Sequence, residues 1–594
     1  MKLVFRKLFF CLLAVVVFTG VVFIKTDKVL AFSAGEAVSF NIDPSYDWAG
    51  RSSVNATLRY VGEKALFYVE DDWWNGLAGS YDLDSLVSGL AGEFDKIIYP
   101  RLTRVFGSEW SPGIDREYRI TFLVFRMKEG TGGYFNSSDE YSKAQAPSSN
   151  EREMLYLNGI YLNSVRTKSF LAHEFQHLIT FYQKDKLKNL AEDVWLNEAR
   201  SEYAPTVCGY DDDYSGSNLE RRVNEFLRNP SDSLTEWRNE SEDYGPVSLF
   251  MQYFVSRYGE AILLKMMMSD AVGIASINAA LSEAGFTDRF SDVFTNWTVA
   301  NYVNDCKLGD GQKFCYLNSR LLFARFHLNP SNSNTLLVSY GVNFSFSDSV
   351  KDWAGHWYEI LPQNQGLNLG IIFSGSDKGN FQVPILIYYN DGSKSVRYLK
   401  LNNQKGADII WDFGYKAKSV IIIPSSQTKL TGFSSGDPAY PMSFSAIVTS
   451  AGQASSLLAE QPETNPAPSP APAPAKPNYQ DGSLIRAAGD YRVYVISGKY
   501  KRWIQSPAIF GVYPHFGWQN IIGVTPAERD WYQDAWLVRA DGDYRVYEIN
   551  GDLSKHWLNM SAEQFVKFGG AWDMVYVINK KERDLYKTGA DVTK

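Results

Sequence analysis

A run of proline and alanine near the carboxyl terminus divides this chain and limits what it can fold into. The segment QPETNPAPSPAPAPAKPN occupies residues 461–478, and alternating proline favours an extended, semi-rigid polyproline II spacer. We therefore expect residues 453–479 to be a Pro/Ala-rich linker that keeps folded modules apart. At 594 residues the chain is also too long for a single core, and its length predicts about three or four domains.

After the linker the sequence repeats itself. Residues 489–506, GDYRVYVISGKYKRWIQS, match residues 542–559, GDYRVYEINGDLSKHWLN. Strand patterns separated by turn residues predict that each copy is a three-stranded meander with short helices. We expect one tandem β-rich module at residues 480–594, with its copies at 480–533 and 534–594.

Before the linker, the order of apolar patterns predicts an α+β multidomain protein. Strand patterns at 118–125 (YRITFLVF) and 153–159 (EMLYLNG) come first, and helical patterns dominate from about 167 to 304. We expect residues 32–330 to form one catalytic unit. In residues 331–452, short β-rich runs are separated by Gly, Asn, Asp and Ser, which is typical of an antiparallel β-sandwich.

The amino terminus carries an export signal. Basic residues precede an apolar run at 8–24, and the Val-Leu-Ala at 29–31 is a small-residue cleavage pattern. Residues 1–31 are either a cleaved signal peptide or an uncleaved membrane anchor, since the run is barely long enough to span a bilayer. Both alternatives predict a secreted or cell-surface protein.

Three cysteines follow the export signal. Cys306 and Cys315 bracket a short loop with two glycines, and Cys208 would be left over. In an oxidising compartment Cys306 and Cys315 form a disulfide; the alternative is that both remain unpaired thiols. None of the cysteines has the spacing of a cysteine zinc site.

The segment FLAHEFQHLITF, residues 170–181, contains two of the six histidines of the chain. On a helix, His173 and His177 lie on one face, one turn apart, so both imidazoles can bind one Zn²⁺ ion. Glu174 is turned by about 100° from His173 and can take a proton from a water molecule at the metal. The alternative is a pair of partly buried histidines satisfied by local hydrogen bonds.

A zinc site of this kind needs a third protein ligand and an open fourth position. The next helical pattern, residues 192–204, contains Glu198 and Glu202 four residues apart and therefore on one face. One of them could bind zinc while the other accepts the N–H of a ligand histidine and fixes its tautomer. The alternative for either glutamate is a solvated helix face.

The pattern HEFQH, followed after seventeen residues by WLNEARSEYA, resembles the gluzincin metallopeptidases, most of all the hyicolysin-like neutral metallopeptidases. This resemblance implies a thermolysin-like domain in which His173, His177 and Glu198 bind zinc and Glu174 is the general base. It also implies an outer hydrogen-bonding role for Glu202, where thermolysin-like proteins have Asp. The resemblance covers about residues 54–304 and includes the segment 243–259, DYGPVSLFMQYFVSRYG.

In related families a tyrosine of the corresponding region can donate a hydrogen bond to the oxyanion, and the resemblance makes Tyr244 the candidate for this role. The alternative for Tyr244 is a core tyrosine at a helix start. The aminopeptidase pattern Gly-x-Met-Glu-Asn is absent. In thermolysin-like enzymes the substrate adds to a sheet edge near the motif helix, so the strand at 153–159 is predicted to be such an edge or else a core strand.

These features predict an exported zinc-dependent endopeptidase acting on proteins or peptides. The alternatives are a zinc aminopeptidase and a cell-surface binding protein with a weakly active or inactive peptidase domain.

A net charge of −8 without a basic stripe argues against a nucleic-acid partner. Trp503 and the matching Trp557 are core residues or bind a cell-envelope or polymer ligand. The acidic loop 210–216 is a solvated turn or a Ca²⁺ site.

Overall fold

The structure is a computed structural model, and it describes residues 32–77, 81–329, 334–363, 367–449, 479–487, 492–550, 553–560, 565, 572 and 575–592. The chain divides into two compact units, Met1–Gln461 and Pro462–Lys594. The first contains helices and sheets and the second is rich in strands, which confirms an α+β multidomain chain with a β-rich carboxyl-terminal region. The predicted export signal and residues 453–478 of the predicted linker lie outside the described residues.

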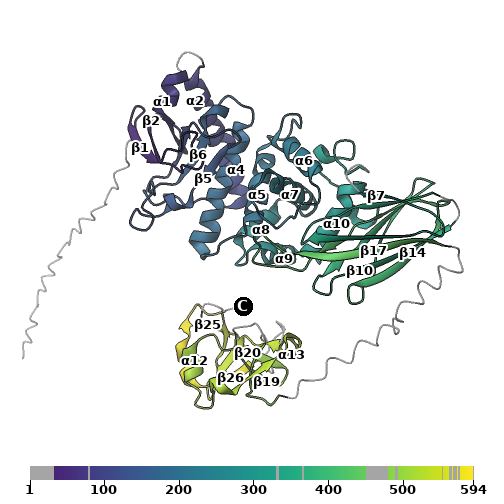
Figure 1. The fold of residues 1–594 in the computed structure, drawn as a ribbon. Coiled ribbons are helices and arrows are strands. Elements are labelled where there is room, and N and C mark those ends of the chain that lie inside the picture. The colour runs from purple at the N-terminus through teal and green to yellow at the C-terminus, as the bar shows by residue number, and fades with distance from the viewer. Residues whose placement is uncertain are drawn as a thin grey trace, which may run out of the picture. The chain divides into compact units, whose positions relative to one another are not determined.

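A mixed sheet opens the first unit (Figure 1). Its strands follow the order β1–β2–β3–β4–β6–β5. Strands β3, β4 and β6 are parallel, and the other neighbours are antiparallel. Their bounds are β1 Ala37–Asn41, β2 Ser53–Val61, β3 Ala65–Glu70, β4 Ile120–Phe125, β5 Gly133–Phe135 and β6 Met154–Asn158. Strands β2 and β3 are consecutive in the chain and form an antiparallel hairpin.

Both faces of this sheet are covered. In β4, Phe122 and Val124 belong to the main core beside the helices, and Leu123 and Phe125 belong to a smaller core on the opposite face. Successive side chains of a strand point to opposite faces. The continuous apolar run of β4 therefore fits a strand that is buried on both sides.

Helices make up most of the rest of the chain up to residue 303. They are α1 Asp71–Leu77, α2 Leu83–Glu93, α3 Tyr99–Phe106, α4 Thr167–Thr180, α5 Val194–Cys208, α6 Asn218–Arg228, α7 Tyr244–Tyr258, α8 Ala261–Met268, α9 Gly273–Glu283 and α10 Phe290–Val303. Figure 1 shows α4 between the sheet and the helices α5 and α7. Helix α4 contacts β5 and β6 on one side and α5 on the other, so it is largely buried.

The predicted edge role of residues 153–159 is wrong. Strand β6 lies between β4 and β5, and β5 is the last strand of the sheet on this side in the described part of the chain. The three residues of β5 are too few to give a strand pattern in the sequence. This short strand, and not β6, is the sheet edge beside the motif helix.

The β-rich region after the helices contains a nine-stranded sheet, in which two groups of strands are joined by a single parallel pair, Phe413 of β14 with Ala417 of β15. One contains β7, β9, β15, β12 and β13, and the other contains β14, β10, β17 and β8. The bounds are β7 Asn334–Val338, β8 Asn343–Lys351, β9 Tyr358–Pro362, β10 Leu367–Gly375, β12 Pro384–Tyr389, β13 Lys394–Tyr398, β14 Lys405–Phe413, β15 Ala417–Ile422 and β17 Ala439–Thr449. Residues of both groups share one core, among them Ile360, Ile385, Phe373 and Phe444.

Most strand pairs in this region are antiparallel, as expected, whereas β7 pairs with β9 in parallel. The region packs on the helical part of the same unit. The Trp357 indole donates to the carbonyl of Thr298 in α10 at 3.0 Å, and the backbone N–H of Leu234 donates to the carbonyl of Trp353 at 2.8 Å.

Cys306 and Cys315 form the disulfide that the sequence offered as one alternative. Cys208, in α5, is a free and buried cysteine. Within the described residues, no helix is sufficiently long and apolar to cross a membrane.

In the second unit, each sequence copy forms a sheet with more strands than the predicted meander. The described residues give the strand orders β21–β18–β19–β20–β22 and β26–β23–β24–β25–β27. The bounds are β18 Leu484–Ala487, β19 Tyr494–Ser497, β20 Tyr500–Trp503, β21 Ile521–Val524, β22 Gln533–Asp534, β23 Leu537–Ala540, β24 Val546–Ile549, β25 Ser554–Trp557, β26 Val575–Ile578 and β27 Lys587–Thr588. The outer strands β21, β22, β26 and β27 each pair in parallel with a strand that is distant in sequence. A local sequence pattern does not predict such pairing. Trp503 and Trp557 are half-buried and pack against the cores of this unit.

Candidate metal centre and cleft

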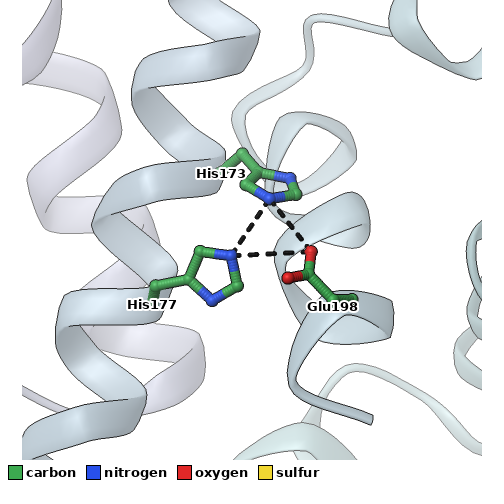
Figure 2. Close-up of side chains that lie close together, drawn as sticks. All are labelled: His173, His177 and Glu198. Atoms are coloured by element: carbon green, nitrogen blue, oxygen red, sulfur yellow. Dashed lines mark hydrogen bonds and ion pairs between the residues drawn. The ribbon is translucent and has the colours of Figure 1, made fainter. Parts of the chain in front are cut away.

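Two helices bring the predicted metal ligands together. Helix α4 presents His173 and His177 on one face, and α5 presents Glu198 toward them. Figure 2 shows both imidazoles and the carboxylate converging on one point. These residues form the single group of three or more metal-ligating side chains found among the described residues, with ligand atoms within 4.8 Å of one another.

The distances in this triangle fit a tetrahedral zinc ion. The two Nε2 atoms lie 3.1 Å apart, and Glu198 Oε2 lies 3.3 Å from His173 Nε2 and 3.6 Å from His177 Nε2. Ligands at 2.0–2.1 Å in a tetrahedral site are separated by about 3.3 Å. Glu198 Oε2 is buried and accepts no hydrogen bond of ordinary geometry, so this atom is free to bind a cation. The donor set of two imidazoles and one carboxylate is therefore suited to Zn²⁺.

Hydrogen bonds on the far side of each ring orient the lone pairs of the Nε2 atoms. His177 Nδ1 lies 3.1 Å from Ser201 Oγ, and Ser201 Oγ donates to Gln176 Oε1 at 2.6 Å. Because that hydroxyl proton is already used, Ser201 accepts the Nδ1–H of His177. His173 Nδ1 lies 3.3 Å from Glu202 Oε1. Both Nε2 atoms are thus left to bind a metal.

Burial and the neighbouring charges set the protonation of the two glutamates of α5. Burial alone favours their neutral forms, but His177 and His173 lower the pKa of Glu198 to about 2. For Glu202 burial acts the same way, and Arg222 together with His173 holds the pKa well below its usual range. Both side chains are therefore carboxylates at neutral pH, which a metal ligand and an acceptor for a histidine N–H must be.

Arg222 is a site residue that the sequence reasoning missed. Its guanidinium donates to both oxygens of Glu202, at 2.8 Å from Nε and 2.6 Å from Nη2, and also to Glu225 at 2.8 Å. Asn218 donates to Glu202 at 2.8 Å. The available signal was an arginine on the apolar face of α6, between Leu219 and Phe226 at helical spacing.

We expect Arg222→Met to destabilise the protein by about 3–5 kcal/mol, because it leaves the carboxylate of Glu202 buried without its partner. Denaturant unfolding of the full chain measures this free energy. Arg228→Met, on the exposed end of the same helix, is the matched control and should change it by less than about 0.5 kcal/mol. Equal effects of the two substitutions would contradict the proposed ion-pair role.

A cleft of about 550 Å³ opens beside the triangle. His173, Glu174 and Tyr244 line it, together with glycines of the β4–β5 connection and β5. Burial is the main cause that raises the pKa of Glu174 above its usual range. Gly133 of β5 lies so close to the motif helix that an added Cβ would be 3.1 Å from Glu174 Cγ and 2.5 Å from the Tyr156 carbonyl oxygen. The edge strand therefore borders the carboxylate directly.

Tyr244 begins α7 and faces the same cleft. The guanidinium of Arg222 lies 4.1 Å from the centre of its ring, and Trp237 contacts it edge to face at 4.9 Å. Burial, together with the nearby Glu198, raises the pKa of Tyr244 far above its usual range. The hydroxyl therefore keeps its proton and remains a hydrogen-bond donor at neutral pH.

Two carboxylates of the acidic loop 210–216, which the sequence offered as a solvated turn or a Ca²⁺ site, form hydrogen bonds and an ion pair within the protein. Asp211 accepts from the Thr206 hydroxyl at 2.5 Å and from the Leu219 backbone N–H at 3.1 Å. Asp212 forms an ion pair with Arg320. No group of three acidic ligands assembles there in the described residues.

Two histidines and a glutamate that form a metal-binding triangle, beside a cleft that contains a further carboxylate, are the arrangement expected from the resemblance to the gluzincin peptidases. The chain is 26% identical over 273 residues to the neutral metalloprotease ShpI of Staphylococcus hyicus, which covers 41% of this chain. This similarity confirms the predicted resemblance to the neutral metallopeptidases. The chain spans 58% of the length of that relative.

Other comparisons add little. No family model matches the chain. Among solved structures, the pre-peptidase carboxyl-terminal domain of a Bacillus anthracis collagenase is 9% identical, with 20% of this chain and 96% of that chain covered and a TM-score of 0.14. PliG, a periplasmic lysozyme inhibitor of Aeromonas hydrophila, is 8% identical, with 20% and 99% covered and a TM-score of 0.14. Scores this low carry no conclusion about the fold or the function.

Proposed function

We propose that this protein is an exported zinc-dependent endopeptidase with a thermolysin-like catalytic unit at residues 32–330. The observation that carries the proposal is the triangle of His173, His177 and Glu198 beside a cleft that also contains Glu174. The similarity to a neutral metalloprotease supports it. Bound zinc would polarise the scissile carbonyl and lower the pKa of a water molecule.

The residues of the cleft supply the remaining chemistry. Glu174 takes the proton of the attacking water and passes it to the leaving amine. Its buried carboxylate, with a raised pKa, is suited to both steps. Tyr244 donates a hydrogen bond to the developing oxyanion. Glu202 and Ser201 hold the imidazoles in the required tautomers, and Arg222 holds Glu202.

Strand β5 favours an endopeptidase over an aminopeptidase. Its outer edge is unpaired in the described part of the chain and it borders Glu174. An extended substrate segment can add to such an edge through backbone hydrogen bonds, which requires no free amino terminus.

Cleavage of peptides blocked at both ends tests this choice. We expect internal cleavage of such peptides and of casein, at the same rate with or without an amino-terminal block. Cleavage that requires a free amino terminus would indicate the aminopeptidase. No hydrolysis of any protein by the zinc-loaded chain would favour the surface-binding alternative.

We also propose that residues 331–452 and the module 480–594 are accessory, and that the module binds a cell-envelope or polymer ligand. Export by residues 1–31 predicts a mature protein outside the cytoplasm. Amino-terminal sequencing distinguishes a cleaved signal peptide from an uncleaved membrane anchor. Cleavage of the signal peptide gives a mature protein that begins near residue 32, whereas a retained anchor gives a protein that begins at Met1 and is found in the membrane fraction.

A further inference from the structure

Part of the cleft beside the metal triangle is positively charged. Arg166, which directly precedes α4, and Arg221, in α6, both line the cleft. The two side chains reach the same short segment of the chain. Arg166 Nε donates to the Gly216 carbonyl at 3.4 Å, and Arg221 Nη2 donates to Asn218 Oδ1 at 2.5 Å. Both arginines are half-buried, and this arginine pair forms a cationic patch on the cleft.

The carboxylates nearest to the arginine pair are already bound by another arginine. Arg222 is buried and forms ion pairs with Glu202 at 2.6 Å and with Glu225 at 2.8 Å. Glu225 Oε1 lies 3.6 Å from Arg221 Nη1, so two guanidinium groups share this carboxylate. Arg221 Nε is buried without a hydrogen-bond partner, and Arg166 forms no ion pair in the described part of the chain. Positive charge in the patch is therefore only partly offset.

The other acidic side chains that line the cleft do not offset this charge. Glu174 lies at the metal centre, where the proposed mechanism uses it as the base. Glu240, on the turn that leads to α7, is exposed, and its Oε2 lies 3.6 Å from Arg238 Nη2. A carboxylate of the substrate would supply the missing negative charge, because guanidinium N–H groups bind carboxylates strongly and often in pairs.

Strand β5 indicates which part of a substrate reaches the arginine pair. The strand runs from Gly133 to Phe135, and Gly133 borders Glu174. Antiparallel strand pairs are roughly two to three times as common as parallel ones. A peptide that pairs antiparallel with β5 runs from Phe135 toward Gly133 and then past residues 130–132, which also line the cleft. The part of the substrate on the carboxyl side of the scissile bond therefore follows residues 130–132.

Residues 130–132 lead to the arginine pair. The Gly130 backbone N–H donates to the Tyr161 hydroxyl at 3.0 Å, and Tyr161 lies five residues before Arg166 and lines the same cleft. Arg166 precedes His173 by seven residues, which is about 10 Å along a helix. An extended peptide covers about 10 Å in roughly three residues. The arginine pair is thus placed for the second or third residue after the scissile bond.

We propose that Arg166 and Arg221 bind a carboxylate of the substrate, two or three residues on the carboxyl side of the scissile bond. This inference rests on the proposed peptidase function and adds a substrate class to it, namely peptides with a negative charge at that place. The carboxylate is the side chain of Asp or Glu, or the terminal carboxyl group of a short peptide. Both sources present the same chemistry to a guanidinium. The arginine pair sets specificity and takes no part in the chemical step.

Matched peptides test this preference and separate the two sources of the carboxylate. One set has Glu or Gln at the second or third position after the scissile bond and an amidated carboxyl terminus. The other set ends at that position with a free or an amidated carboxyl group. We expect kcat/KM to be about 10-fold higher for the charged member of a pair, as for a charge-assisted hydrogen bond at a half-exposed site. The difference should lie in KM, because the contact persists from bound substrate to transition state.

Variants of the arginine pair connect the preference to these two side chains. Arg166→Gln and Arg221→Gln should raise KM for the charged peptides and remove most of the preference, whereas Arg166→Lys should keep part of it. Arg166→Glu should favour Lys over Glu at the same substrate position, an inversion that a merely structural arginine would not give. Arg228→Gln, at the exposed end of α6, is the matched control and should keep the wild-type preference.

Peptide binding without turnover separates failure of this inference from failure of the proposed function. Fluorescence anisotropy of labelled Glu and Gln peptides with the zinc-loaded Glu174→Gln protein should give a Kd about 10-fold lower for the Glu peptide. That difference, with no hydrolysis of any peptide by the wild type, would refute the peptidase and support the carboxylate site. Hydrolysis with equal KM and equal Kd for all charged and uncharged pairs would overturn the carboxylate site alone. A preference that survives in the double variant of Arg166→Gln and Arg221→Gln would also overturn it.

Discussion

Replacing Glu174 with glutamine lowers the turnover of casein by about 10²- to 10⁴-fold, the usual contribution of a general base. Glutamine keeps the shape of the side chain but cannot accept the proton of the attacking water. The zinc content should stay at that of the wild type, because Glu174 is absent from the triangle of metal-ligating atoms. Turnover and zinc content measured on the same preparation separate the chemical step from metal binding.

The matched control is Glu129→Gln, an exposed glutamate on the loop that leads to β5. It should retain wild-type turnover. A Glu174→Gln protein that binds zinc and hydrolyses casein as fast as the wild type would refute the role of this carboxylate. A variant that has lost its zinc would show instead that Glu174 maintains the metal site.

Replacing Glu198 with alanine removes one of the three protein ligands, and we expect zinc affinity to fall by more than about 100-fold. Removing a residue that hydrogen-bonds to a metal ligand typically lowers metal affinity by about 10- to 100-fold. We expect Glu202→Ala to lower zinc affinity by an amount within that range. Ser201→Ala should lower it by a similar amount, because the Nδ1–H of His177 loses its acceptor. Competition with a chromogenic zinc chelator measures all three affinities.

Glu283→Ala supplies the control for this series, since that side chain is exposed and pairs only with Lys265 in the described structure. Its zinc affinity should equal that of the wild type. If Glu198→Ala retains a full equivalent of tightly bound zinc while Glu202→Ala does not, the ligand roles of the two glutamates are exchanged.

Much of the fold could be predicted because the relevant signals are local. The hairpin of β2 and β3, the helical pattern of α4 and the repeat after the linker all depend on residues near one another in sequence. Elements that are too short for a pattern were missed. Strand β5 has three residues and β22 has two, and both depend on pairing with distant segments.

The candidate site shows the same division. The spacing of His173 and His177 places them on one helix face regardless of the rest of the chain. Arg222 and Ser201 could not be assigned in this way, because their roles depend on how α5 and α6 pack against α4. The residues that flank an arginine or a serine on a helix do not indicate which carboxylate or imidazole it will contact in the folded protein.

The sequence by itself determined the pair of histidines, the glutamate beside them and the nearby pair Glu198 and Glu202, because helical periodicity fixes which side chains share a face. Only the tertiary structure decided which glutamate completes the triangle, which strand borders the cleft and where carboxylates are buried together. Those features depend on the crossing of helices and the order of strands, which bring together residues that are far apart in the chain.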